Sequence, residues 1–189
     1  MPTNFHEEEA QTAAAGLAST RLDFAGLFRE YYPRVYNYLR YRVSTPEDAE
    51  DLIGAVFEKA YTHRRKFDPS KGTFSRWLFG IAHNTLGNYY RSRERRSAWE
   101  SESELPDDLL VSETSPETQL IRQQSITELL SSLDRLSERD REVISLKFAG
   151  RLSNQEIGQI MDLKEKTVSV VLLRAMRRLQ QLLAEGGEK

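Results

Sequence analysis

Apolar residues recur along this chain at the three- and four-residue spacing of an amphipathic helix, and no segment sustains the alternation of a half-buried strand. A loop is expected over residues 64–72, which contain the turn-forming pairs Asp68-Pro69 and Lys71-Gly72. The pattern therefore predicts an all-α protein. Its helices are expected to cover about residues 24–43, 46–63, 73–95, 126–136, 138–149, 153–162 and 165–183.

Local signals mark where several of these helices begin. Pro46 suits a first helical turn, because the amide proton that proline lacks is not needed there. Ser137 can cap the helix that follows it. Ser153 and Glu156 have the spacing of a capping box, in which each side chain bonds a free amide at the helix start. Gly158 stands where a small residue would let two helices approach closely.

Composition divides the chain into two small helical domains. Residues 97–116 are rich in Ser and Glu and show no helical stripe, so we expect a flexible acidic linker there. The linker separates a domain over residues 21–96 from a domain over residues 117–185. Residues 1–20 contain three acids and no Lys or Arg, which predicts a disordered tail rather than a secretory signal.

Charge is distributed unevenly along the chain. The formal net charge of −2 would by itself argue against nucleic acid as a partner. However, residues 59–96 hold ten basic and two acidic side chains, whereas residues 97–120 hold seven acidic and no basic ones. Such blocks indicate segments with different partners, and the basic block makes nucleic acid a candidate again.

The helices near the C-terminus have the arrangement of a helix-turn-helix, with two helices joined by a tight turn and a basic second helix. The second helix of this motif enters the major groove with its first turns against base edges. Side chains there can bond phosphates, guanine or several bases. The residues available are Lys164, Lys166, Thr167, Ser169, Val170 and Arg174. We predict DNA binding; a helical interaction module with a solvated basic face is the alternative.

Val170, Val171 and Leu173 are apolar positions that this helix does not need for its buried stripe. Some of the three are therefore expected to be exposed. We hypothesise that Val170 contacts a thymine methyl group in the major groove.

The basic block interleaves arginines with aromatic residues, a combination that suits unpaired nucleic acid, because rings stack on bases while guanidinium groups hold the backbone. Trp77 falls on the apolar stripe and is assigned to the core instead. The block and its end contain Trp77, Phe79, Tyr89, Tyr90 and Trp99 among Arg76, Arg91, Arg93, Arg95 and Arg96.

The sequence shows no set of catalytic or metal-binding residues. It contains no cysteine, and its three histidines lie far apart, as expected of surface residues or, for His83, of a nucleic-acid face. It has no glycine-rich phosphate loop, and no apolar run approaches the roughly 18 residues of a membrane span. We predict a cytoplasmic protein that is not an enzyme, has no cofactor or metal, and does not span a membrane.

Several segments together resemble the extracytoplasmic-function (ECF) sigma factors. Residues 28–39, 48–53, 72–78 and 81–84 are similar to sigma domain two, and residues 136–143 and 152–157 are similar to sigma domain four. The resemblance covers about residues 22–183, with the order and spacing of the motifs kept. It implies a sigma factor that binds core RNA polymerase and directs promoter-specific initiation of transcription.

The resemblance implies a role for each surface. The helix over residues 47–61 would dock on the clamp helices of the largest polymerase subunit, through Asp48, Glu50, Asp51, Leu52, Ile53 and Phe57. The segment 64–96 would read and melt the minus-ten element as single strands, through Lys66, Arg76, Asn84, Tyr89, Arg91, Arg93, Arg95 and Arg96. The helix-turn-helix would bind the double-stranded minus-thirty-five element. The domain that contains it would bind the polymerase flap. The acidic linker would either enter the RNA path or act as an inert spacer. An anti-sigma factor is a typical partner of the family, although these residues do not themselves show one.

The chain also departs from the family pattern. Gly54 and Ala55 replace a usual Gln-Glu pair, and His83 stands where arginine is common. Residues 169–171 replace a usual run of a basic residue, Ser and Arg. We therefore predict a weaker electrostatic grip at the minus-thirty-five element, with more of the promoter affinity carried by residues 64–96.

Two other classes of protein were weighed. A stand-alone helix-turn-helix transcriptional regulator would leave residues 22–96 unexplained. A protein-interaction adaptor made of helical hairpins would leave both basic surfaces unexplained.

Overall fold

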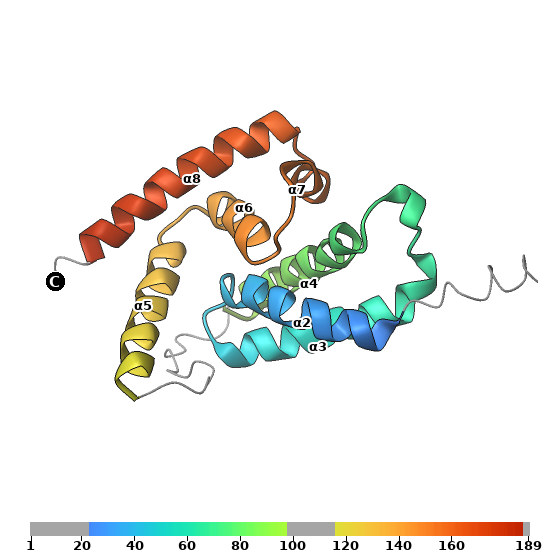
Figure 1. The fold of residues 1–189 in the computed structure, drawn as a ribbon, viewed down its shortest axis with the longest axis horizontal. Helices are drawn as coiled ribbons and strands as arrows, with labels where there is room; N and C mark the ends of the chain where they lie inside the picture. Colours follow the sequence, from blue (N-terminus) through green and yellow to red (C-terminus); the bar gives the residue numbers. More distant parts are fainter. Residues whose placement is uncertain (1–22, 98–115, 187–189) are drawn as a thin grey trace, which may run out of the picture.

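The computed structural model describes residues 23–97 and 116–186, and all regular structure within these ranges is helical (Figure 1). This confirms the predicted all-α class. The predicted tail and almost all of the predicted linker lie outside the described residues. The N-terminal group of helices comprises α2 (Phe24–Arg40), α3 (Pro46–His63), η1 (Arg64–Lys66), η2 (Pro69–Lys71) and α4 (Phe74–Ser97). The C-terminal group comprises α5 (Pro116–Asp134), α6 (Glu138–Phe148), α7 (Asn154–Met161) and α8 (Glu165–Gly186).

The predicted caps are present at the helix starts. Ser137 Oγ accepts a hydrogen bond from the Asp140 amide at 3.2 Å and so caps α6. Ser153 Oγ accepts from the Glu156 amide at 3.2 Å, while the Ser153 amide donates to Glu156 Oε2 at 2.9 Å, which completes the capping box of α7. The segment 64–72, expected as a loop, instead forms the two short 3-10 helices η1 and η2.

A tight turn joins α7 to α8 as the sequence predicts. A Cβ atom on Gly158 would lie only 2.5 Å from the Leu163 carbonyl oxygen, so a small residue is needed where the two helices meet. Asp162 ends α7 in the left-handed conformation, with φ of 54°. The turn directs α8 across both α6 and α7, which it contacts.

Two clusters of buried apolar residues hold the chain together. The larger cluster contains residues of α2, α3 and α4, such as Val35, Val56 and Leu78, and it continues into Leu146 and Ile157 of the C-terminal group. The smaller cluster lies within the C-terminal group. It consists of Leu133, Leu136, Ile144, Ala175, Leu179 and Leu182.

Helix α6 lies between these two clusters. Val143 and Leu146 belong to the larger cluster, whereas Ile144 belongs to the smaller one. Accordingly, α2 contacts α6 and α4 contacts α7 (Figure 1). The two groups of helices therefore pack directly on each other, a contact that sequence reasoning did not anticipate.

Candidate nucleic-acid interface

The first turns of α8 present a polar and apolar surface to solvent. Val168 and Val171 are buried, at 0% and 4% exposure, and fix the rotation of the helix. Val170 is 67% exposed and Leu173 is 55% exposed, which confirms that some of these extra apolar positions face solvent. The predicted contact residues Lys164, Lys166, Ser169, Val170 and Arg174 are all exposed, and Thr167 is half-buried.

Two of these residues are held by contacts within the chain. Ser169 Oγ accepts a hydrogen bond from Asn154 Nδ2 at 3.0 Å, which ties the second helix of the motif to the first. Arg174 Nη2 lies 2.8 Å from Asp140 Oδ1 of α6. The guanidinium is therefore oriented before any ligand binds, at the edge of the exposed surface.

The second half of α4 carries the other predicted contact residues. Asn84, Arg91, Arg93 and Arg95 are exposed. Arg93 Nη1 donates to the Tyr89 hydroxyl at 2.8 Å and lies 3.8 Å from Asp48 Oδ2. Burial, more than any neighbouring charge, raises the pKa of Tyr89, so its hydroxyl stays protonated at neutral pH.

Other predicted contact residues lie toward the opposite end of α4. Lys66 is exposed on η1, and Arg76 Nη2 donates to the Lys71 carbonyl at 2.8 Å. At about 1.5 Å per residue, Arg76 lies about 22 Å along the helix from Arg91. The predicted residues are therefore spread along α4: Arg76 near its start, Asn84 near its middle and Arg91 near its end. The side chain of Arg96 lies outside the described residues, as does Trp99.

The aromatic residues of the basic block divide into core and surface. Trp77 packs against Phe67 and Phe74, with ring centroids 5.6 and 5.4 Å away, in agreement with its assignment to the core. Phe79 is completely buried, so the suggestion that its ring stacks on bases is wrong. Tyr89 and Tyr90 remain half-buried next to the arginines.

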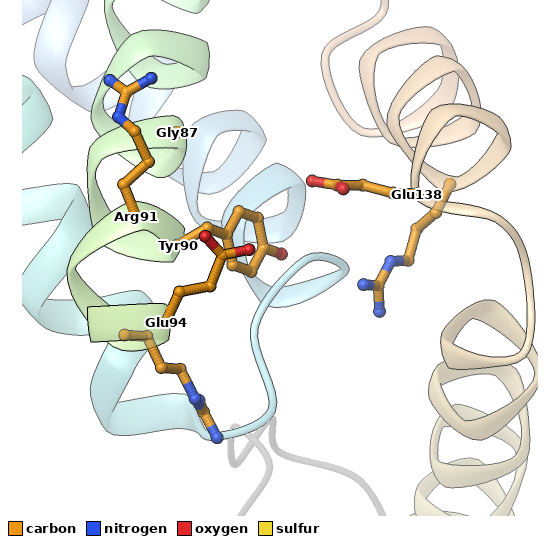
Figure 2. A pocket seen from close by; sticks show the side chains of 7 residues that line it. Gly87, Tyr90, Arg91, Glu94 and Glu138 are labelled. Atoms are coloured by element: carbon orange, nitrogen blue, oxygen red, sulfur yellow. The ribbon is translucent and has the colours of Figure 1, made fainter. Parts of the chain in front are cut away.

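A cleft of about 510 Å³ opens between α4 and α6 (Figure 2). Tyr90, Arg91 and Glu94 line it from α4, and Glu138 reaches toward them from α6. The hydroxyl of Tyr90, one of the lining residues, donates to the backbone carbonyl of Arg42. Three arginines and two glutamates line the cleft, so most of the positive charge there is balanced.

Helix α3 was expected to contact a protein partner. Glu50 and Asp51 are exposed and Asp48 is half-buried. The other predicted contact residues, Leu52, Ile53 and Phe57, are only 7%, 3% and 6% exposed and belong to the core. A partner on this helix would therefore meet the acids first, whereas the apolar residues hold the helix in place.

Exposed aromatic rings adjoin this acidic surface. Phe28 of α2 is 39% exposed and packs against Phe57 with a centroid distance of 4.6 Å. Tyr32 and Tyr61 are 37% and 51% exposed. Helical spacing predicts an apolar stripe, but it does not show which rings at the rim of that stripe stay uncovered.

A buried carboxylate joins the two groups of helices, and sequence reasoning missed it. Glu142 of α6 is 4% exposed. It accepts a hydrogen bond from Tyr38 of α2 at 2.7 Å, forms an ion pair with Arg42 and lies 2.9 Å from His83 Nδ1 of α4. His83 therefore contacts another part of the chain, while 37% of its side chain remains exposed.

The surroundings of Glu142 favour its charged form. Burial alone would raise the pKa of this carboxyl group, but the hydrogen bond from His83 and the positive charge of Arg42 outweigh burial and lower the pKa. Burial and the neighbouring carboxylate hold the pKa of Tyr38 well above its usual value, so Tyr38 remains a hydrogen-bond donor.

Within residues 23–97 and 116–186, no group of three or more His, Asp or Glu residues is arranged to hold a metal ion. None of the helices described there combines the length and apolar character that crossing a membrane requires.

Comparison with protein families matches both halves of the chain. Residues 27–96 match sigma-70 region 2, and residues 126–179 match sigma-70 region 4. The two matched segments coincide with the N-terminal and C-terminal groups of helices.

Individual proteins give the same result. The chain is 30% identical to the ECF RNA polymerase sigma factor BldN of Streptomyces coelicolor, over 94% of this chain and 66% of that protein. It is also 30% identical to the ECF RNA polymerase sigma factor SigM of Bacillus subtilis, over 85% of this chain and 94% of SigM.

Solved structures have a similar fold. CnrH, in complex with the cytosolic domain of CnrY, superposes with a TM-score of 0.62 at 25% identity, over 92% of this chain and 95% of CnrH. The sigma factor RpoE of Bartonella quintana, in complex with the anti-sigma factor NepR, gives a TM-score of 0.70 at 24% identity, over 86% of this chain and 97% of RpoE, and supports the fold alone.

Proposed function

This chain belongs to the ECF RNA polymerase sigma factors, and from that premise we propose that it reads a promoter through two separate DNA-binding surfaces while α3 holds the polymerase. The observation that carries the proposal is that exposed cationic residues gather at the end of α4 and at the start of α8. Each gathering lies within a different matched sigma-70 region. The domain boundaries follow as residues 21–96 and 117–185, joined by the acidic segment.

The end of α4 is proposed to hold the melted minus-ten element. Arg91, Arg93 and Arg95 would bind phosphates, while Tyr89 offers a ring edge for an unpaired base. Arg96 is included because it continues the same run of cations in the sequence. Lys66, Arg76 and Asn84, which precede the end of α4 in the sequence, would also contact the DNA. Holding an extruded base offsets a few kcal/mol of unstacking.

The start of α8 is proposed to enter the major groove of the minus-thirty-five element. Lys164 and Lys166 would bind phosphates or guanine, and Thr167 and Ser169 would position the helix. Arg174, already oriented by Asp140, would add a phosphate contact. Phosphate contacts fix the position of the helix on the DNA but do not distinguish one base from another. Base discrimination here would therefore rest on few residues.

Helix α3 is proposed to dock on the clamp helices of the largest polymerase subunit through Asp48, Glu50 and Asp51. The domain over residues 117–185 is proposed to dock on the polymerase flap. Exposed acids speed the encounter with a basic partner more than they add affinity. The uncovered rings of Phe28 and Tyr61 would then be covered by the same partner.

A regulatory protein partner is also proposed. CnrH was solved together with the cytosolic domain of CnrY, and an anti-sigma factor would be the corresponding partner of this chain. We place the chain in the cytoplasm with the polymerase, in a non-enzymatic role.

Run-off transcription from a linear promoter template with purified core polymerase tests the function. A sigma factor initiates only together with core enzyme, whereas a stand-alone regulator binds duplex DNA without it and initiates nothing. The decisive variant replaces Arg91, Arg93, Arg95 and Arg96 by alanine. Its matched control replaces the same four residues by lysine, which keeps the positive charge.

The alanine variant should lose open-complex formation and show a weaker salt dependence of DNA binding, since each lost phosphate contact lowers the slope by about 0.7 on single strands. The lysine variant should keep most of both. Equal open-complex formation by the wild type and the alanine variant would show that these four arginines are not needed for promoter melting.

A further inference from the structure

Ser169, in the second turn of α8, has hydrogen bonds that are set by two other helices. Lys147 Nζ of α6 donates to Asn154 Oδ1 of α7 at 2.9 Å, and Asn154 Nδ2 donates to Ser169 Oγ at 3.0 Å. The hydroxyl of Ser169 in turn donates to the Glu165 backbone carbonyl at 3.2 Å. A chain of hydrogen bonds therefore runs across the helix-turn-helix and ends at the exposed start of α8.

The ammonium group of Lys147 fixes the direction of this chain of hydrogen bonds. A lysine side chain can only donate, so the oxygen of the Asn154 amide faces it and the amide nitrogen faces Ser169. An amide nitrogen also only donates, and Ser169 Oγ therefore accepts from it. Asn154 is itself held in place, because it directly follows Ser153, the residue that caps α7.

These bonds leave the Ser169 hydroxyl with one lone pair for a ligand. A serine hydroxyl has one proton and two lone pairs. The Glu165 carbonyl takes the proton, and Asn154 takes one lone pair. Because Ser169 is exposed, the second lone pair is accessible to a molecule that lies against α8. Toward that molecule the hydroxyl is an acceptor, since donating to it would give up the bond to Glu165.

Base edges in the major groove differ in whether they offer a donor. Adenine and cytosine each present an exocyclic amino group there, whereas guanine presents only acceptors and thymine presents an acceptor and a methyl group. An acceptor hydroxyl therefore pairs with adenine or cytosine. The exposed cations Lys164, Lys166 and Arg174 only donate, and they suit guanine or phosphate. Ser169 thus adds a base preference that these cations cannot supply.

We propose that Ser169 is a specificity-determining residue for the minus-thirty-five element, an inference that rests on the proposed function. Beyond positioning α8, its hydroxyl accepts a hydrogen bond from the exocyclic amino group of an adenine or a cytosine in the major groove. Asn154 and Lys147 are positioning residues, because they act on that base only through Ser169, by holding its hydroxyl as an acceptor.

Selection of promoter DNA by the assembled holoenzyme tests the proposal. The full-length chain and core polymerase are mixed with linear duplexes randomised over both promoter elements, and sequencing of the bound fraction gives the base preference at each position. At one position of the upstream element the wild type should prefer adenine or cytosine by about three- to tenfold, the usual effect of one hydrogen bond. Ser169→Ala should lose this preference at that position alone. Ser131→Ala, the same change at an exposed position of α5, should keep it.

Base analogues show which amino group is bound. Deoxynebularine is deoxyadenosine without its amino group, and deoxyzebularine is deoxycytidine without its amino group. Placed at the selected position, the matching analogue should weaken binding of the wild type by about three- to tenfold. It should have little further effect on Ser169→Ala, because the two changes remove opposite sides of one hydrogen bond. An analogue that weakens binding of both proteins equally would assign the amino group to another residue and overturn the inference.

The positioning residues are tested in the same selection. Asn154→Ala and Lys147→Met keep the Ser169 hydroxyl but let it rotate, so each should reduce the preference for an amino group at unchanged helical content by circular dichroism. An unchanged preference in both variants would overturn the positioning role of Lys147 and Asn154. Wild-type preferences at every position in Ser169→Ala would overturn the inference and leave the proposed function intact. A holoenzyme that shows no base preference in the upstream element would overturn the proposed function as well.

Discussion

The Tyr38 hydroxyl on α2 donates a 2.7 Å hydrogen bond to the Glu142 carboxylate on α6, and neither residue is more than 4% exposed. The tyrosine ring also packs edge-on against Phe79 of α4, with a centroid distance of 5.6 Å. One side chain therefore contributes both to the apolar core of the N-terminal group and to the polar contact with the C-terminal group. This double role makes the stability of the interface measurable by conservative substitutions.

The first prediction concerns this hydrogen bond. Tyr38→Phe should lower the free energy of unfolding by about 1.5–3 kcal/mol, the usual contribution of a hydrogen bond to a charged group. Glu142→Gln should lower it by about 3–5 kcal/mol, because Arg42 loses its buried partner. The double variant should lose less than the sum, since the charge-assisted bond is removed only once. Urea unfolding followed by circular dichroism measures all three.

Tyr61→Phe is the control for this cycle, because its ring is 51% exposed, and it should change stability by less than about 0.5 kcal/mol. Strictly additive losses in the double variant would mean that Tyr38 and Glu142 do not act as a pair.

The second prediction concerns pH. The pKa of Glu142 is lowered in the folded chain from its ordinary value of 4.5, so the stability from its contacts is present above pH 4.5 and is lost as pH falls through the lowered pKa. The advantage of the wild type over Glu142→Gln should therefore shrink progressively below pH 4.5. Tyr38, Arg42 and His83 face the same carboxylate.

A His83→Gln variant is compared in parallel, because the hydrogen bond from His83 is one of the causes that lower the pKa of Glu142. Urea unfolding at half-unit steps from pH 3 to pH 6 gives the profile. An advantage that stays constant down to pH 3 would show that the ionised form of Glu142 does not stabilise the interface.

The third prediction contrasts two glycines. Gly54 lies inside α3, and a Cβ there would meet no atom within 4 Å. Gly54→Ala should stabilise the chain by about 1 kcal/mol through helix propensity. For a chain of this length that corresponds to a rise of about 2–4 °C in Tm. Gly158→Ala should have the opposite effect, because its Cβ would lie 2.5 Å from the Leu163 backbone oxygen.

Calorimetry of the two alanine variants measures both effects on one scale. A lower Tm for Gly54→Ala would contradict the expectation that helix propensity decides the effect at this open position.

Local signals explain why most helices could be predicted from the sequence. Ser137 and Ser153 accept hydrogen bonds from amides three residues ahead, a relationship that depends only on neighbouring residues. The start of α3 at Pro46 follows from the same kind of local constraint. The bounds of α3, α6 and α7 were therefore predicted to within about one residue.

The interface could not be predicted, because it depends on residues far apart in the chain. Glu142 and His83 are 59 residues apart, and each is a charged or polar residue of the kind usually found at the surface. One signal was present: Val143 and Ile144 are adjacent in α6, so they point to different sides of the helix. Each belongs to a different apolar cluster, and such two-sided burial indicates a helix packed between two bodies.

The fourth prediction concerns Val170 near the start of α8. This residue is 67% exposed, although an exposed aliphatic side chain does not stabilise the free chain. If it covers a thymine methyl group, Val170→Ala should weaken binding to the minus-thirty-five duplex by about 1 kcal/mol, the scale of one buried methyl group. Replacing that thymine by uracil should weaken binding of the wild type by a similar amount.

The two changes remove opposite sides of one contact, so uracil should have little further effect on the Val170→Ala variant. Leu183→Ala, at a 36% exposed position near the far end of α8, should leave the thymine preference unchanged. Fluorescence anisotropy at fixed salt with matched thymine and uracil duplexes measures each affinity. Because the contact is apolar, the thymine preference should persist as salt rises, whereas total affinity falls with the loss of phosphate contacts from Lys164 and Lys166. A thymine preference of the same size in Val170→Ala would assign methyl recognition to another residue of the helix.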